Sequence, residues 1–185
     1  MKHFEGKYYH GYNRGVEKRR IFMMDENYYF LLRRAKKFII NYPLRILSYC
    51  LMPTHYHFFF GVDEDDALAP FLRRLFSSYT QAFNLQEGRT GTLFEGRSKS
   101  KLVDDSSYAL RLVRYLHLNP VRAGLVNHPN GWAFSDYLAW TGQQTGEFYD
   151  KNFGSMLFSN PDQYRLFVDD GLEQDEDDRF LNAVY

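Results

Sequence analysis

The chain has 185 residues and a formal net charge of zero, and its length is typical of one domain. Its single cysteine excludes an intrachain disulfide and is typical of a protein in a reducing compartment. The N-terminus lacks the apolar core of a signal peptide, and no apolar run approaches the roughly 20 residues that span a bilayer, so we expect a cytoplasmic protein with no membrane partner. The neutral charge conceals an asymmetry of +6 over residues 1–168 and −6 over residues 169–185, and the basic body favours a polyanionic partner.

Residues 8–13 are predicted to form a first strand that ends at Gly15. Asp25 is expected to cap a helix over residues 26–41. Five apolar residues of that segment recur at helical spacing and would form one stripe, namely Leu31, Leu32, Ala35, Phe38 and Ile39. The pattern therefore predicts a strand followed by an amphipathic helix.

Residues 44–52 and 55–62 are predicted to be two strands of an antiparallel hairpin, because the Pro53-Thr54 pair between them favours a turn. The acidic residues 63–66 come next and are expected to start a helix over about residues 67–86. Negative charge at that position complements the positive end of a helix.

Gly88 interrupts the helical pattern, and residues 92–103 are predicted to be extended with a central turn. Residues 104–106 are expected to cap a helix that runs to about Leu118, because Pro120 discourages its continuation. The resulting order β-α-β-β-α-β-α predicts an α+β sandwich with helices packed on a mainly antiparallel sheet.

Two histidines, His55 and His57, alternate along the second strand of the hairpin and therefore point to one face. Two neutral imidazoles on one face of a strand can chelate a single metal ion. A lone H-x-H pair is more often satisfied by ordinary hydrogen bonds, so the pair does not establish a metal site by itself.

Arg111, Tyr115 and Asn119 are spaced four apart and share one face of the predicted helix. Asn119 could supply a carbonyl oxygen as a third metal ligand, and Tyr115 would present a phenol beside the ion. A phenol titrates near pH 10, so its attack on phosphorus needs a base or a cation. The alternative is that Tyr115 is one core aromatic among 15 tyrosines, and spacing alone favours that alternative.

Five segments together resemble the REP-associated tyrosine transposases, a family of the insertion-sequence single-tyrosine HUH transposases. LMPTHYHFFF is similar to the HUH motif, and YLHLNPVRAGLV is similar to the tyrosine-bearing segment. The segments YNRG, LFEGRSKSK and WAFSDY also resemble the family and follow its order. The resemblance covers roughly residues 8–140 and implies a ferredoxin-like or RRM-like fold with the HUH strand central.

The resemblance implies that His55 and His57 bind the metal, that Asn119 is the third ligand and that Tyr115 is the nucleophile. The metal would be Mg²⁺ or Mn²⁺, which also suits the chemistry. The implied reaction is cleavage of single-stranded DNA near hairpins, with a 5′-phosphotyrosine intermediate and a free 3′-OH. Tyr56 occupies the middle HUH position and should face away from the metal.

Arg97, Lys99 and Lys101 alternate along the predicted extended segment and share a face that could follow phosphates. For four further candidates a solvated or salt-bridged side chain is an equal alternative, namely Arg14, Arg111, Arg114 and Arg122. His117 follows the tyrosine by two residues and is expected to serve in packing or DNA contact. The remaining histidines, His10 among them, are assigned no role.

We expect residues 1–140 to form the nuclease domain and residues 141–185 a C-terminal extension. Its acidic tail would either solubilise the protein or compete with DNA for the basic body. Two other functions stay open. One is a module that binds nucleic-acid hairpins without cutting, because an RRM-like sheet rich in aromatics can bind RNA. The other is a metal-dependent hydrolase that uses water as its nucleophile. The active species would be a monomer or a homodimer.

Overall fold

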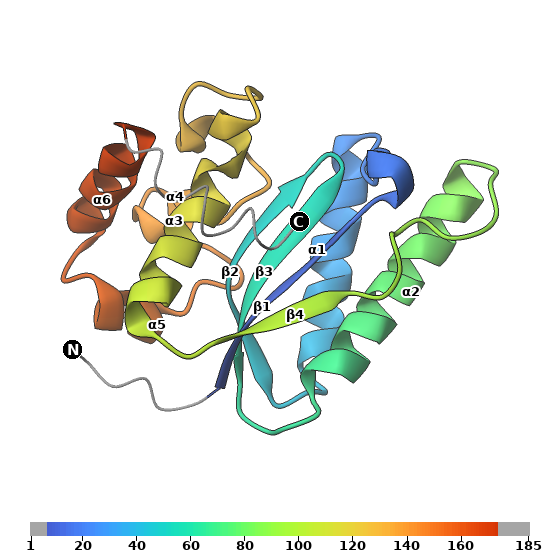
Figure 1. Cartoon of the computed structure of the whole chain (residues 1–185), viewed down its shortest axis with the longest axis horizontal. Coiled ribbons are helices and arrows are strands. Elements are labelled where there is room, and N and C mark those ends of the chain that lie inside the picture. Colours follow the sequence, from blue (N-terminus) through green and yellow to red (C-terminus); the bar gives the residue numbers. More distant parts are fainter. Residues whose placement is uncertain (1–6, 174–185) are drawn as a thin grey trace.

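Four antiparallel strands form one sheet in this computed structural model, which describes residues 7–173 (Figure 1). The strands are β1 (Lys7–Arg14), β2 (Leu44–Met52), β3 (His55–Val62) and β4 (Lys99–Val103). Their order across the sheet is β2-β3-β1-β4, and every pair is antiparallel. The H-x-H strand β3 is therefore central, and the predicted α+β, ferredoxin-like fold is confirmed.

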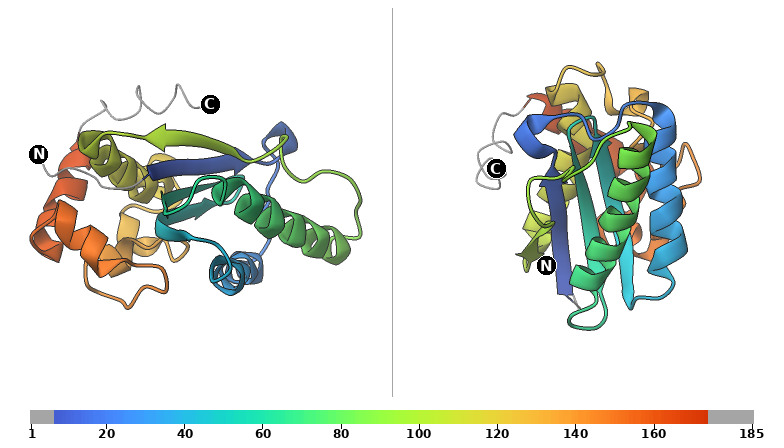
Figure 2. Two further views of the ribbon diagram at one scale, coloured as in Figure 1. Left: turned by 90° about the horizontal axis from the view of Figure 1, so that it is seen from below. Right: turned by 90° about the vertical axis from the view of Figure 1, so that its right-hand side faces the viewer.

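Helices cover both faces of the sheet, as the three views of Figures 1 and 2 agree. The helical segments are η1 (Val16–Lys18), α1 (Asp25–Ile39), α2 (Leu68–Gln86), α3 (Ser106–Arg122), η2 (Pro129–Gly131), α4 (Tyr137–Trp140), α5 (Lys151–Leu157) and α6 (Pro161–Glu173). Helices α1 and α2 pack together on one face, and α3 with the helices that follow it lies on the other. None of the helices within residues 7–173 combines the length and apolar character that crossing a membrane requires.

Alternating side chains of β3 divide the interior into two cores, one on each side of the sheet. Tyr56, Phe58 and Phe60 lie in the core beneath α1 and α2, whereas Phe59 lies in the core beneath α3. His57 shares the orientation of Phe59, because side chains two residues apart on a strand face the same way. The H-x-H pair is thus presented to α3.

The start of α1 differs from the prediction. Met24, not Asp25, is the N-cap residue, and Asp25 lies in the first turn. The Asn27 side-chain oxygen accepts hydrogen bonds from the backbone N–H groups of Met23 at 2.8 Å and Met24 at 3.2 Å. An amide that reaches back in this way stabilises the helix start as a cap would, and Asp25 can still favour the helix through its charge.

Helix α3 continues through Pro120 to Arg122, so the prediction of an end near Leu118 is wrong. Pro120 lies in the last turn, where the loss of one N–H donor interrupts little of the helix. The turn is still closed, because the Ala123 backbone N–H donates to the Asn119 carbonyl at 2.9 Å. Asn119 therefore lies one turn after Tyr115 in an unbroken helix.

Residues 92–103 are only partly extended. The strand is confined to β4, and the preceding segment is a series of bends with an isolated bridge from Phe94 to Gly15, the residue after β1. The predicted boundary at residue 140 falls at the end of α4. The extension then packs back onto α3, with Phe153 and Tyr164 buried in the core that contains Leu116. The acidic run extends beyond residue 173, and that part of the predicted tail lies outside the described residues.

Candidate active site

The two histidines of β3 lie together on the α3 face of the sheet, with their ring centroids 5.1 Å apart. His57 is fully buried, and His55 is half-buried at the start of the strand. Tyr56 between them points into the opposite core and shares a 2.7 Å hydrogen bond with the Ser98 hydroxyl. Tyr56 therefore faces away from the histidine pair, as predicted.

Helix α3 brings Tyr115 and Asn119 to the same place. The Tyr115 ring meets the His57 ring edge-on, with centroids 5.4 Å apart. The Asn119 side chain is hydrogen-bonded to His55, and its Nδ2 donates to the Tyr115 carbonyl at 3.2 Å. The two constellations predicted from the sequence, one on a strand and one on a helix, thus converge in the structure.

Burial keeps both histidines neutral. It lowers the pKa of His55 to about 4, although the hydrogen bond with Asn119 acts in the opposite direction and Arg14 adds to the lowering. Burial also lowers the pKa of His57 well below its usual value, and the neighbouring His10 and His55 lower that pKa further. A neutral imidazole is the form that ligates a metal ion.

The donor set fits a divalent ion held by two imidazoles and an amide oxygen. The Nδ1 atom of each histidine already has a partner: Thr54 Oγ1 lies 3.0 Å from that of His55, and His10 Nε2 lies 2.9 Å from that of His57. Such contacts orient ligating histidines, which would then use Nε2. Within residues 7–173 no three His, Cys, Asp or Glu side chains are arranged to hold a metal. The Asn119 side chain, which is hydrogen-bonded to His55, is placed to supply an amide oxygen as a third ligand.

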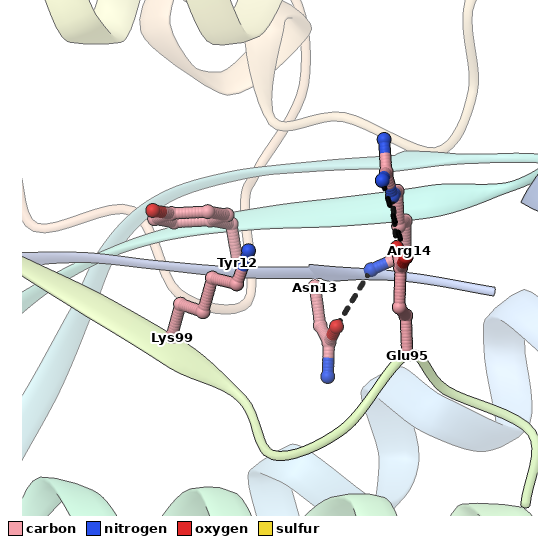
Figure 3. A pocket seen from close by; sticks show the side chains of 5 residues that line it. All are labelled: Tyr12, Asn13, Arg14, Glu95 and Lys99. Atoms are coloured by element: carbon pink, nitrogen blue, oxygen red, sulfur yellow. Dashed lines mark hydrogen bonds and ion pairs between the residues drawn. The ribbon is translucent and has the colours of Figure 1, made fainter. Parts of the chain in front are cut away.

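A small pocket lies between β1 and the segment leading into β4 (Figure 3). Figure 3 shows Tyr12 and Asn13 leaving β1 on opposite sides, with Lys99 next to Tyr12. The Arg14 guanidinium is paired with the Glu95 carboxylate at the other end of the pocket. Arg14 can bind a phosphate only if its guanidinium contacts the phosphate and Glu95 together or releases Glu95.

Cross-strand register aligns basic and aromatic residues with the histidines. Tyr12 pairs with His57 on one side and with Lys99 on the other, so these three side chains share one face. His10 pairs with Lys101 in the same way. The ring of Tyr12 is stacked 6.5 Å from that of His57. Sequence reasoning gave neither Tyr12 nor His10 a role, and the signal that could have identified them is this strand pairing.

The predicted DNA-contacting residues do not all lie in one place. Arg97, Lys99 and Lys101 are exposed, and the Lys101 ammonium lies 5.1 Å from the centre of the Tyr108 ring. Arg111 and Arg122 on α3 are half-buried, and Arg111 donates to the Ser107 hydroxyl at 3.2 Å.

Arg114 does not lie with the other basic residues. It is buried between α3 and α6, where its guanidinium donates to the Phe167 carbonyl at 3.3 Å, lies 4.3 Å from the centre of the Phe167 ring and approaches Asp170 at 3.8 Å. This placement makes Arg114 a packing residue that joins the two helices.

His117 is fully buried and anchors α3 to the rest of the protein. Its Nε2 donates to Asp136 at 2.8 Å, and its Nδ1 is hydrogen-bonded to the Tyr164 hydroxyl of α6. Asp136 also accepts hydrogen bonds from the Ser48 hydroxyl and the Trp140 indole, both at 2.9 Å. Of the two roles expected for His117, the structure supports packing.

No protein-family model matches the chain. A curated protein of Haemophilus influenzae that carries the name of a REP-associated tyrosine transposase is 24% identical over 132 residues, which cover 66% of this chain and 71% of the relative. A solved REP-associated tyrosine transposase bound to a REP hairpin has a TM-score of 0.63 and 18% identity, and the match covers 81% of this chain and 94% of that structure. The resemblance drawn from the motifs is confirmed, and so is the fold.

Proposed function

We propose that the chain is a REP-associated tyrosine transposase, a metal-dependent and site-specific endonuclease and strand transferase for single-stranded DNA at hairpins. The observation that carries the proposal is the convergence of Tyr115 and Asn119 of α3 on His55 and His57 of β3, with 5.4 Å between the rings of Tyr115 and His57. The similarity to a curated transposase and to a transposase bound to a REP hairpin supports the same substrate class here.

Tyr115 is the proposed nucleophile, and the fold fixes the position of its phenol. Its ring is mostly buried against His57, and its helix is anchored two residues later by the buried His117. Tyr115 Oη attacks the phosphorus and loses its proton, the bond to the O3′ atom breaks, and O3′ takes up a proton. The 5′-phosphate stays on Tyr115 as a phosphotyrosine, and attack by another 3′-OH would reverse the step and join strands.

His55, His57 and Asn119 are the proposed ligands of a Mg²⁺ or Mn²⁺ ion. When bound, the ion supplies Lewis-acid polarisation of a phosphoryl oxygen. The two histidines contribute neutral imidazoles because burial keeps their pKa values low. Asn119 contributes an oxygen whose orientation is set when its Nδ2 donates to the Tyr115 carbonyl.

The edge strand β4 is the proposed path of the DNA backbone next to the site. Lys99 and Lys101 are exposed and lie on the same face of the sheet as the histidines, and β1 separates their strand from β3. Lysines placed in this way can neutralise successive phosphates. Tyr12 is half-buried between Lys99 and His57 and offers an aromatic ring on which an unpaired base can stack.

A denaturing gel tests the proposal directly. The protein is incubated with Mg²⁺ or Mn²⁺ and a single-stranded hairpin oligonucleotide that is labelled at its 3′ end, so that a 5′-phosphotyrosine adduct keeps the label. The proposal predicts a metal-dependent, protease-sensitive band of covalent protein–DNA complex. Cleavage without such a band would indicate a hydrolase that uses water, and binding without cleavage would indicate a hairpin-binding module.

A further inference from the structure

A third histidine lies against the proposed metal site from the neighbouring strand. His10 of β1 is fully buried, and its Nε2 lies 2.9 Å from His57 Nδ1. The two rings are nearly parallel, with an interplanar angle of 24° and centroids 5.1 Å apart. His10 is therefore hydrogen-bonded directly to His57 Nδ1. While that bond is present, His57 cannot ligate an ion through Nδ1.

A hydrogen bond between two ring nitrogens needs one proton, and the choice of donor decides what His57 can do. If His57 Nδ1 donates, neutral His57 presents the lone pair of Nε2 and can ligate an ion. If His10 Nε2 donates instead, neutral His57 carries its proton on Nε2 and cannot ligate. The direction of the hydrogen bond between His10 and His57 therefore decides whether neutral His57 can ligate an ion.

The other nitrogen of His10 argues against a role in packing alone. Among residues 7–173 the buried His10 Nδ1 has no hydrogen-bond partner. An apolar side chain of similar size would fill the same space without burying an unpaired polar atom. Within residues 7–173 the contact with His57 Nδ1 is therefore the hydrogen bond that accounts for a polar side chain at this position.

We propose that His10 is a positioning residue, which accepts a hydrogen bond from His57 Nδ1 and so holds His57 in the tautomer whose Nε2 can ligate the divalent ion. This inference rests on the proposed function, because it requires His57 to be a metal ligand. His10 acts through His57 and touches neither the ion nor the DNA. Partners of this kind typically change metal affinity by about 10- to 100-fold when they are removed.

The test measures Mn²⁺ binding to the DNA-free protein by calorimetry or electron paramagnetic resonance. We expect His10→Leu, which removes the acceptor, to weaken Mn²⁺ binding by about 10- to 100-fold. His10→Gln places an amide oxygen near the former Nε2 and should restore affinity to within a few-fold of the wild type. Circular dichroism and hairpin binding without metal verify that each variant is folded.

A matched control separates the hydrogen bond from general damage to the core. Tyr8 is buried on the same strand and the same face, and its ring contacts Phe59 and Phe153. Tyr8→Leu should leave Mn²⁺ affinity unchanged. In the wild type loaded with Mg²⁺, long-range ¹H–¹⁵N spectra should show the proton of His57 on Nδ1.

The outcomes distinguish this inference from the proposed function. Wild-type affinity in His10→Leu, or a His10→Gln variant no better than His10→Leu, would overturn the role of His10 while the metal site stands. Mn²⁺ binding that is insensitive to His57→Ala would overturn the metal site itself, and the role of His10 with it.

Discussion

Removing the carboxylate of Asp136 should destabilise the protein and loosen the tyrosine-bearing helix. Asp136 is buried at the start of α4 and accepts four hydrogen bonds of 2.8–2.9 Å, from Ser48 Oγ, Tyr49 N, His117 Nε2 and Trp140 Nε1. In Asp136→Ala these donors lose their acceptor inside the protein. The bonds join β2, α3 and α4, so their loss removes a direct link between α3 and the sheet.

The magnitude follows from burial. Removing one partner from a buried, hydrogen-bonded charged group typically costs about 3–5 kcal/mol, because the remaining polar groups are left unsatisfied. Ser48 Oγ and His117 Nε2 lie 3.3 Å apart and can satisfy each other in part, which favours the lower end of that range. Since a domain of this size is stable by about 5–15 kcal/mol, the loss is a large fraction of the total.

Urea unfolding, followed by tryptophan fluorescence, measures this effect. We expect the midpoint of Asp136→Ala to fall by about 1.5 M, which is about 3 kcal/mol divided by a dependence on urea of about 2 kcal/mol/M. Asp162→Asn is the control, because Asp162 is exposed and its ion pair with Arg165 lies on the surface, so the substitution should leave the midpoint unchanged. An Asp136→Ala variant within 1 M of the wild-type midpoint would refute the anchoring role of the network.

Three further predictions concern the site. His55→Ala and His57→Ala should each abolish metal-dependent cleavage, and full activity of either variant would refute the metal site. Asn119→Ala should reduce cleavage less, because water can replace an amide oxygen. His128→Ala is the control. Log affinity for hairpin DNA should fall linearly with log salt, and Lys99→Ala should reduce that slope by about 0.7 for a single-stranded contact; an unchanged slope would remove Lys99 from the DNA path. Burial lowers the pKa of His10 to about 3 and of His55 to about 4. The contribution of these two histidines to stability is therefore complete above pH ~6.5 and is lost progressively as pH falls toward those values. Urea midpoints measured against pH should show this decline, and the decline should be shallower in His10→Leu.

Local patterns in the sequence predicted much of the architecture. The strand bounds at residues 44–52 and 55–62 coincide with β2 and β3, because a proline turn separates two apolar runs there. The four-residue spacing of Tyr115 and Asn119 placed them correctly on one helix face, since that relation depends only on helix geometry. The convergence of this helix on β3 was implied by the family resemblance and not by spacing.

Features that depend on pairing between distant segments were not predictable from local patterns. His10 acquires its partner only because β1 lies beside β3, in a register that pairs it with Phe59 and sets its ring against His57. Arg114 looked like its basic neighbours, but α6 returns across α3 and buries it. Pro120 was expected to end α3, yet a proline in the last turn is compatible with a helix that continues for two more residues.

Peptide mapping of the protein–DNA adduct shows whether Tyr115 is the residue that becomes covalently attached to DNA. The complex formed with hairpin DNA and Mn²⁺ is digested with a nuclease and a protease, and the modified peptide is sequenced by mass spectrometry. We expect a nucleotide on Tyr115, no adduct in Tyr115→Phe, and normal adduct formation in Tyr137→Phe. The buried hydroxyl of Tyr137 has no hydrogen-bond partner within residues 7–173. A nucleotide on Tyr12 or Tyr108, or undiminished adduct in Tyr115→Phe, would contradict the assignment of Tyr115 as the nucleophile.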